Sequence, residues 1–173
     1  MNVFSDDMFF INGLNSLYEY MAEDYINFFD IGNGDVYMLD VSNIESYYCY
    51  DSLQLFNFCR KSIFSKKDSI LGFHDKFLNI KYKAKAVDGK KNNHLTEKEI
   101  LAIKCGLLGC TQRSAARQIG INEKMLSRLK ISALRKMNFN SFSDFYICYA
   151  TWERLWEEFQ AHDLKLLQSG FII

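Results

Sequence analysis

Proline is absent from the 173 residues, and the first 59 residues contain no lysine or arginine. Without proline, the ends of helices and strands have to be read from glycines and capping residues. The first 59 residues also carry ten Asp and Glu side chains, so this segment repels the phosphates of a nucleic acid. The formal net charge of zero conceals a strongly polarised chain.

Long apolar runs are missing as well. No segment approaches the roughly 18 to 20 apolar residues that a membrane span requires, which predicts a protein without a membrane partner. The start of the chain is acidic at Asp6 and Asp7, unlike a cationic secretory leader, so a cytoplasmic location is expected. A hydrophobic fraction of 49% is ample for a packed core.

The usual signatures of metal and catalytic sites are also lacking. The five cysteines, at positions 49, 59, 105, 110 and 148, include no Cys-x-x-Cys pair and have no histidine at zinc-finger spacing. We therefore expect reduced, buried thiols and no cofactor. No Gly-rich phosphate loop, zinc-protease pair or nucleophile with a neighbouring base is present, which argues against an enzyme.

Basic charge is concentrated in the middle of the chain. Residues 60–93 hold ten basic and three acidic side chains, and residues 94–140 hold nine and three, whereas the tail from Ser141 holds two and five. Residues 87–93 are turn formers and charged residues without apolar periodicity, which is typical of a linker. We expect two domains, at residues 1–89 and 94–173.

The first domain is predicted to be an α/β layer. Strands are expected at residues 2–4, 25–31, 35–41 and 69–73, and helices at residues 8–21 and 51–60. Gly32-Asn33-Gly34 supplies the residues of a tight turn, although the pattern leaves open whether the strands on either side pair as a hairpin.

The second domain begins with two capped helices. Thr96 and Glu99 stand in capping-box register, so a helix is expected from Thr96 to about Leu108, ended by Gly109. Thr111 is expected to cap a short helix at residues 112–119 that stops at Gly120. Its small pair Ala115-Ala116 would allow a neighbouring helix to approach closely.

Asn122 is expected to cap a third helix at residues 123–136, with one apolar and one cationic side. The predicted inward side chains are Met125, Leu126, Leu129, Ala133, Leu134 and Met137. The predicted outward side chains are Lys124, Ser127, Arg128, Lys130, Arg135 and Lys136. A helix of this kind, braced by a shorter one across a tight turn, can enter the major groove of DNA.

In the order of these motifs, residues 94–140 resemble the C-terminal helix-turn-helix domain of the LuxR/FixJ (GerE-type) bacterial transcription regulators. The matching positions are Leu95, Thr96 and Glu99 at the opening, Gly109, Ala115 and Ala116, Ile119 and Ile121, Asn122, and Lys136 with Met137. The sequence departs from the family at Met125-Leu126, where Thr-Val is usual, and at Leu129, where His is frequent.

The resemblance implies a double-stranded DNA partner. The residues that it places against DNA are Lys124, Ser127, Arg128 and Ile131, with Thr111, Gln112 and Arg113 near the backbone. Lys130 and Arg135, on the same cationic side of the helix, complete the candidate set. The resemblance also implies a homodimer or a heterodimer with a related regulator.

The front of the chain resembles the receiver domains of response regulators, in a truncated form. Asp6 and Asp7 follow the first expected strand and Asp40 closes a later one, which suggests the acidic pocket in which a receiver holds Mg²⁺ and accepts a phosphoryl group. The preferred interpretation is a vestigial pocket, in a receiver-like domain kept for interaction.

Aromatic residues mark the tail. Positions 142, 145, 149, 152, 156 and 159 are all aromatic and follow the spacing of three and four of one helix face, which Ser141 can cap. Such a stripe must be buried. It would form either a dimer seam or a contact with the protein's own N-terminal domain.

The sequence therefore predicts a DNA-binding transcription regulator with a receiver-like α/β domain and an all-α helix-turn-helix domain that ends in an extended helix. The alternative is an interaction protein that modulates another regulator without reading DNA itself; the acidic front favours this alternative, and the cationic helix opposes it.

Overall fold

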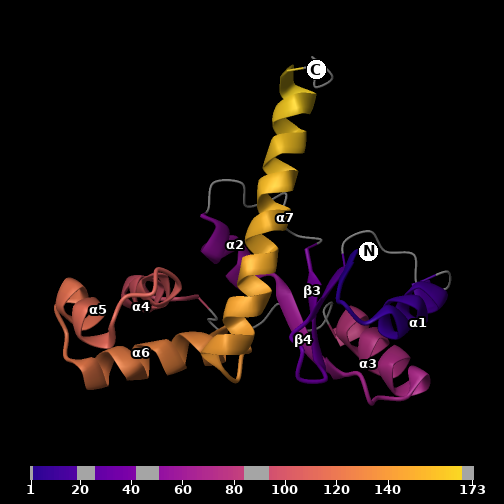
Figure 1. The fold of residues 1–173 in the computed structure, drawn as a ribbon, viewed down its shortest axis with the longest axis horizontal. Coiled ribbons are helices and arrows are strands. Elements are labelled where there is room, and N and C mark those ends of the chain that lie inside the picture. Colours follow the sequence, from indigo (N-terminus) through magenta and orange to yellow (C-terminus); the bar gives the residue numbers. More distant parts are fainter. Residues whose placement is uncertain (1, 19–25, 42–50, 84–93, 169–173) are drawn as a thin grey trace.

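The computed structural model describes residues 2–18, 26–41, 51–83 and 94–168. In chain order, the elements are β1 (Asn2–Phe4), α1 (Met8–Tyr18), β2 (Ile26–Asp30), β3 (Asp35–Asp40), α2 (Ser52–Phe58), β4 (Arg60–Ser65), α3 (Ile70–Lys83), α4 (Glu97–Leu107), α5 (Gln112–Ile119), α6 (Glu123–Lys136) and α7 (Phe142–Gln168). The sheet stands between α1 and α3 on one side and α2 and α7 on the other, and α4, α5 and α6 lie beyond α7 (Figure 1).

The four strands lie side by side in the order β1-β2-β3-β4. The pair β1 and β2 is parallel, whereas β2 with β3 and β3 with β4 are antiparallel. Strands β2 and β3 form a hairpin, because Gly32 (φ 78°) and Gly34 (φ 92°) adopt the positive φ angles of its turn. The pairing that the sequence left open is therefore a hairpin.

Side chains of the sheet alternate between two cores. Along β3, Val36 and Met38 enter one apolar cluster, whereas Tyr37 and Leu39 enter another. This period of two follows from the pleat of a strand. Both faces of the central hairpin are consequently buried, and the sheet is the middle layer of three.

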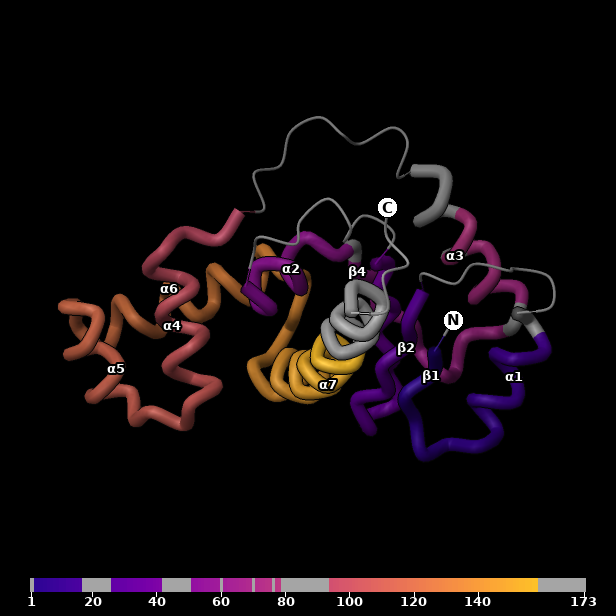
Figure 2. The backbone as a smooth tube through the Cα atoms, turned by 90° about the horizontal axis from the view of Figure 1, so that it is seen from above, coloured from indigo at the N-terminus to yellow at the C-terminus, as the bar shows by residue number. Residues whose placement is uncertain are grey.

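Helices α1 and α3 cover the first face (Figure 2). Phe73 and Phe77 of α3 and Leu14 of α1 pack there against Phe28 and Phe64 of the sheet. Phe64 and Phe73 have ring centroids 4.4 Å apart. This aromatic layer attaches the two helices to the sheet.

Helices α2 and α7 cover the second face. Trp152 of α7 is fully buried, and its indole Nε1 donates to the backbone oxygen and hydroxyl of Ser52, each at 3.1 Å. Phe56 of α2 makes ring contacts with Phe145, Tyr149 and Trp152. The aromatic stripe is thus buried by the chain's own α/β layer from Phe145 to Trp156; the side chain of Phe159 lies outside the described part.

One expectation about secondary structure is wrong, and one strand was not predicted. Residues 69–73 begin helix α3, because Ser69 accepts hydrogen bonds from Gly72 N and, through its carbonyl oxygen, from Phe73 N. The fourth strand is instead β4, which was not predicted.

The expected linker at 87–93 lies outside the described residues. One apolar cluster joins Phe56 and Tyr37 to Ala133 and Phe145 across the expected domain boundary.

The sheet also differs from that of the receiver domains that the front of the chain resembles. A doubly wound receiver has parallel strands in the order 2-1-3-4-5, whereas two of the three strand pairs here are antiparallel and the order is sequential. The predicted α/β layer is confirmed, but its strands are not arranged as in a receiver domain.

Candidate nucleic-acid interface

Helices α4, α5 and α6 have the three caps that their sequence predicts. Thr96 and Glu99 form a complete capping box, in which Thr96 N donates to Glu99 Oε2 (2.8 Å) and Glu99 N donates to Thr96 Oγ1 (3.3 Å). Thr111 accepts from Ser114 N at 3.2 Å, and Asn122 accepts from Met125 N at 2.8 Å. The predicted starts of all three helices are confirmed.

Glycine ends the first two helices as expected. Gly109 has a φ of 68° and Gly120 a φ of 73°, both in the left-handed region that follows a helix. These stops set short connections, so that α5 and α6 are joined across a tight turn. Both helices pack on α4 through Ala102, Ala115, Ala116 and Leu126, all buried. The small side chains allow the close approach of the three axes.

One face of α6 is open to solvent and carries most of the predicted DNA contacts. Lys124, Arg128, Ile131 and Arg135 are exposed, and they recur at spacings of four, three and four residues, which places them on one side of the helix. Ser127, half-buried, borders this stripe. The structure thus brings together the five residues that we call the recognition face.

Helix α5 adds a polar margin to the recognition face. Thr111, Gln112 and Arg113 are all exposed at its N-terminal end. Gln112 Nε2 donates to Ser127 Oγ at 2.8 Å and to the Glu123 carbonyl oxygen at 3.2 Å. This bridge between α5 and α6, which the sequence did not reveal, fixes the first turn of α6 beside α5.

Three side chains of α6 do not lie where the sequence predicted. Met125 was expected inside and is 46% exposed. Lys130 is half-buried with its ammonium 5.6 Å from the Phe142 ring centroid, and Lys136 is half-buried in an ion pair with Glu99 at 2.7 Å. At 100° per residue, position 130 falls within the arc of the packed apolar side chains of α6, position 136 falls at the edge of that arc, and position 125 falls just beyond it.

Glu99 is the electrostatic centre that holds α4 and α6 together. Burial raises its pKa, but hydrogen bonds from Lys136, Ser132 and Thr96 outweigh burial and bring the pKa to about 2. Ser132 Oγ donates to Glu99 Oε1 at 2.6 Å. Glu99 is therefore a carboxylate at neutral pH, and it holds Lys136 in an ion pair between α4 and α6.

Helices α4, α5 and α6 contact the rest of the protein through residues outside the recognition face. Lys104 pairs with Asp51 at 2.7 Å, and Asn138 Nδ2 donates to the Lys61 carbonyl oxygen at 3.2 Å. Phe139, which follows α6, stacks on Tyr37 of the sheet with ring centroids 4.5 Å apart. These contacts leave the recognition face uncovered.

The acidic residues predicted to form a receiver-like pocket are not gathered in one place. Asp6 and Asp7 follow β1, at the same end of the sheet as Asp30, whereas Asp40 pairs in register with Ile26 at the opposite end. The four residue steps between Ile26 and Asp30 separate the two ends by about 13 Å. Because β3 runs antiparallel to β2, Asp40 lies at the end of the sheet away from Asp6 and Asp7. The prediction of a pocket with these three carboxylates is therefore wrong.

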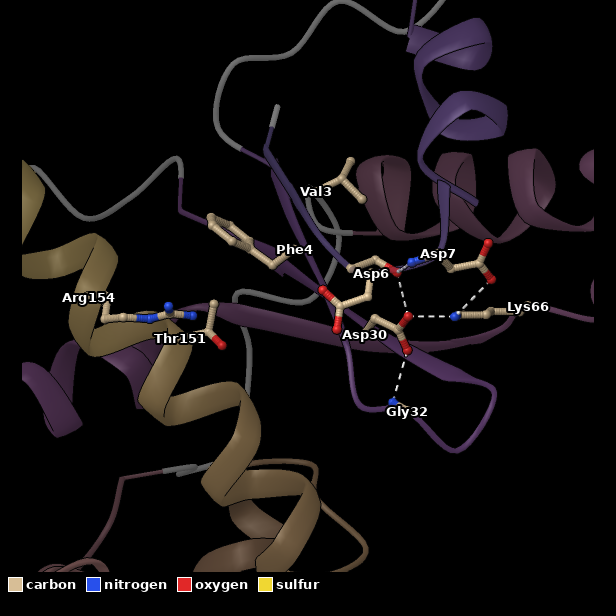
Figure 3. Close-up of a pocket in the computed structure, with 10 residues that line it drawn as sticks. Val3, Phe4, Asp6, Asp7, Asp30, Gly32, Lys66, Thr151 and Arg154 are labelled. Atoms are coloured by element: carbon tan, nitrogen blue, oxygen red, sulfur yellow. Dashed lines mark hydrogen bonds and ion pairs between the residues drawn. The ribbon is translucent and has the colours of Figure 1, made fainter. Parts of the chain in front are cut away.

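An open cavity of about 700 Å³ lies beside Asp6, Asp7 and Asp30 (Figure 3). Lys66 Nζ lies 2.5 Å from Asp30 Oδ2 and 3.2 Å from Asp7 Oδ2. Burial raises the pKa of Asp30, but hydrogen bonds from Lys66 and Ser5 outweigh it and lower the pKa. Neither Asp30 nor Lys66 was predicted to belong to this site, and Lys66 follows β4, a strand that was not recognised.

Asp7 has a structural task in this cavity. Its Oδ1 accepts from Phe9 N and Phe10 N, each at 3.1 Å, at the start of α1. The hydrogen bond from Phe10 and the contact with Lys66 lower its pKa. Among the described residues, no group of three His, Cys, Asp or Glu side chains is arranged to hold a metal ion.

The described thiols, of Cys59, Cys105, Cys110 and Cys148, are free and buried, except that Cys110 is half-buried. Burial raises the pKa of Cys59 to about 12, so that its thiol is protonated at neutral pH. Within the ranges that the structure describes, no helix has the length and apolar character to cross a membrane.

Comparison with known proteins adds no assignment. No family model matches the chain, and neither a curated protein nor a solved structure matches it.

Proposed function

We propose that this protein is a sequence-specific DNA-binding regulator of transcription, of the kind that its resemblance to the LuxR/FixJ regulators implies. The observation that carries the proposal is the recognition face: Lys124, Arg128 and Arg135 are exposed in one line on a helix that two shorter helices brace. In this arrangement α6 enters the major groove, and its N-terminal half meets the base edges.

The dimensions of the stripe suit a duplex groove. The eleven residue steps from Lys124 to Arg135 span about 16 Å along α6, which is the rise of about five base pairs. An α-helix fits the major groove, whose width is about 12 Å. One copy of α6 can therefore contact a half-site of about five base pairs.

The charges of the recognition face are available for DNA. In the described part of the chain, no ion pair engages Lys124, Arg128 or Arg135. Lys136 and Lys104, by contrast, are held by Glu99 and Asp51. The separation of paired structural cations from unpaired ones on a single face supports binding to a polyanion.

The polar residues divide into two tasks. Arg128 lies in the middle of the stripe, where a guanidinium can donate two hydrogen bonds to O6 and N7 of a guanine. Thr111 and Arg113, exposed at the margin on α5, would make the phosphate contacts that set the register of the helix. Gln112 positions Ser127 through their 2.8 Å hydrogen bond.

The test is selection of bound fragments from a genomic duplex library, followed by footprinting. The wild-type protein is expected to protect discrete sites, and the double variant Lys124→Ala/Arg128→Ala is expected to protect none while it unfolds at the wild-type temperature. The matched control is Lys67→Ala/Arg154→Ala, which removes two exposed cations outside α4, α5 and α6.

Loss of footprints in the first double variant with retention in the control supports the proposal. Full protection by the Lys124→Ala/Arg128→Ala variant contradicts it. A wild-type protein that protects no fragment also contradicts it, and favours instead an interaction protein that modulates another regulator.

A further inference from the structure

Ile131 is an apolar side chain in the middle of the cationic recognition face. It is 50% exposed, and it lies one turn from Arg128 on one side and one turn from Arg135 on the other. It contributes to none of the three buried clusters of the protein. Packing in these three clusters therefore does not require an isoleucine at this position.

We propose, on the basis of the DNA-binding function above, that Ile131 selects thymine at one position of each half-site through contact with the thymine 5-methyl group. The major-groove edges of the four bases present hydrogen-bond donors and acceptors, and the thymine methyl is the one apolar group among them. An apolar side chain between two arginines is therefore suited to contact that methyl group.

The neighbouring residues hold Ile131 at the required place. Its branched Cβ restricts χ1 in a helix, so the position of its methyl groups follows from the position of α6. Helix α6 is in turn fixed by the Lys136 and Glu99 ion pair at 2.7 Å and by the Gln112 bridge to Ser127. A contact of this kind gains specificity from rigidity, because a shift of the helix would move the methyl groups off the base.

Met125 provides an internal comparison. It is another exposed apolar residue of α6, 46% open to solvent. Met125 lies six positions before Ile131, so it points about 120° away from Ile131 around the helix. If exposure of an apolar side chain on α6 were sufficient, both residues would affect base preference; the proposal assigns that effect to Ile131.

The experiment replaces each thymine of a selected half-site, one at a time, with deoxyuridine, which lacks only the 5-methyl group. For the wild-type protein, one replacement is expected to raise Kd about fourfold, the factor that corresponds to one methyl group transferred out of water. The Ile131→Ala variant is expected to bind both duplexes equally. Met125→Ala is expected to retain the fourfold discrimination.

Absence of any deoxyuridine-sensitive thymine for the wild type overturns the inference, as does full discrimination by Ile131→Ala. Discrimination lost equally in Met125→Ala also overturns it. These outcomes leave the proposed function intact, since the protein still binds DNA in each of them. Failure of the wild type to bind any duplex overturns both.

Discussion

Lys136 Nζ lies 2.7 Å from Glu99 Oε2, so the last turn of α6 is held by the carboxylate that also completes the capping box of α4. The same carboxylate accepts from Ser132 at 2.6 Å, and its side chain is 4% exposed. One buried charge thereby determines both where α4 begins and how α6 lies upon it. The direction of the recognition face depends on this contact.

Glu99→Gln should lower the free energy of unfolding by about 1 to 3 kcal/mol at neutral pH. The amide keeps the size of the side chain but removes the charge, and it leaves the half-buried Lys136 ammonium without a counter-ion. Chemical denaturation of the two proteins measures the difference. Glu97→Gln, at an exposed acid of the same helix turn, should have little effect.

The same pair predicts a pH dependence. The pKa of Glu99 is about 2 in the folded protein, against 4.5 for a glutamate without these interactions. The stabilisation of the folded state by the Glu99 carboxylate is therefore complete above pH 4.5 and is lost as the pH falls towards 2. The difference in unfolding free energy between wild type and Glu99→Gln should shrink over that range. A difference independent of pH would contradict this role of Glu99.

Gly106→Ala should destabilise the protein, although alanine favours a helix. A Cβ at this position would stand 2.7 Å from Phe142 Cζ, so the Phe142 ring would have to shift. We expect a loss of about 1 to 3 kcal/mol in unfolding free energy, measured by denaturation.

Gly13→Ala is the matched control, because it is also within a helix and its Cβ would meet no atom within 4 Å. It should stabilise by up to about 1 kcal/mol. If the Phe142 ring is the obstacle, Phe142→Leu should restore stability to the Gly106→Ala protein. Equal effects of the two glycine substitutions would show that the approach of α7 to α4 is not tight.

Trp152→Ser should unfold the protein rather than dissociate a dimer. Trp152 is fully buried between α7 and α2, and its loss removes the two hydrogen bonds to Ser52 together with a large apolar volume. Removal of such a side chain costs about 3 to 5 kcal/mol. Denaturation and sedimentation together distinguish unfolding from dissociation of a dimer. A variant with wild-type stability and half the wild-type mass would show that Trp152 lies in a dimer seam instead.

The C-terminal helices could be predicted from sequence because their ends are local. A threonine or asparagine side chain bonds to an amide two or three residues ahead, and a glycine adopts a positive φ by itself, so Thr96, Thr111, Asn122, Gly109 and Gly120 are sufficient. The spacing of residues 124, 128, 131 and 135 placed the recognition face for the same reason.

The N-terminal sheet was harder to predict because strand direction is not local. The expectation for Asp40 assumed strands that all end at one edge, and only the observed hairpin at Gly32 and Gly34 reverses β3. Residues 60–65 hold only two apolar side chains, Ile63 and Phe64, and residues 69–73 are a short apolar run for which the period does not distinguish strand from helix. The local signal that could have assigned residues 69–73 to a helix was Ser69, which caps α3.

Lys130 and Lys136 show a further limit. Charge alone placed both among the outward residues, but a long side chain can lie along a packed face and reach a partner at its edge. Their partners, the Phe142 ring and Glu99, come from other helices. Such pairs require the arrangement of helices and not only their sequence.

The most direct test of the account is chemical-shift mapping of the wild-type protein in ¹H–¹⁵N spectra during titration with a selected duplex. The recognition face predicts the largest changes at Lys124, Ser127, Arg128, Ile131 and Arg135, smaller ones at Thr111, Gln112 and Arg113, and none in α1 and α3. Changes centred on α1, α3 or the sheet, with α6 unaffected, would contradict the claim that this face reads DNA.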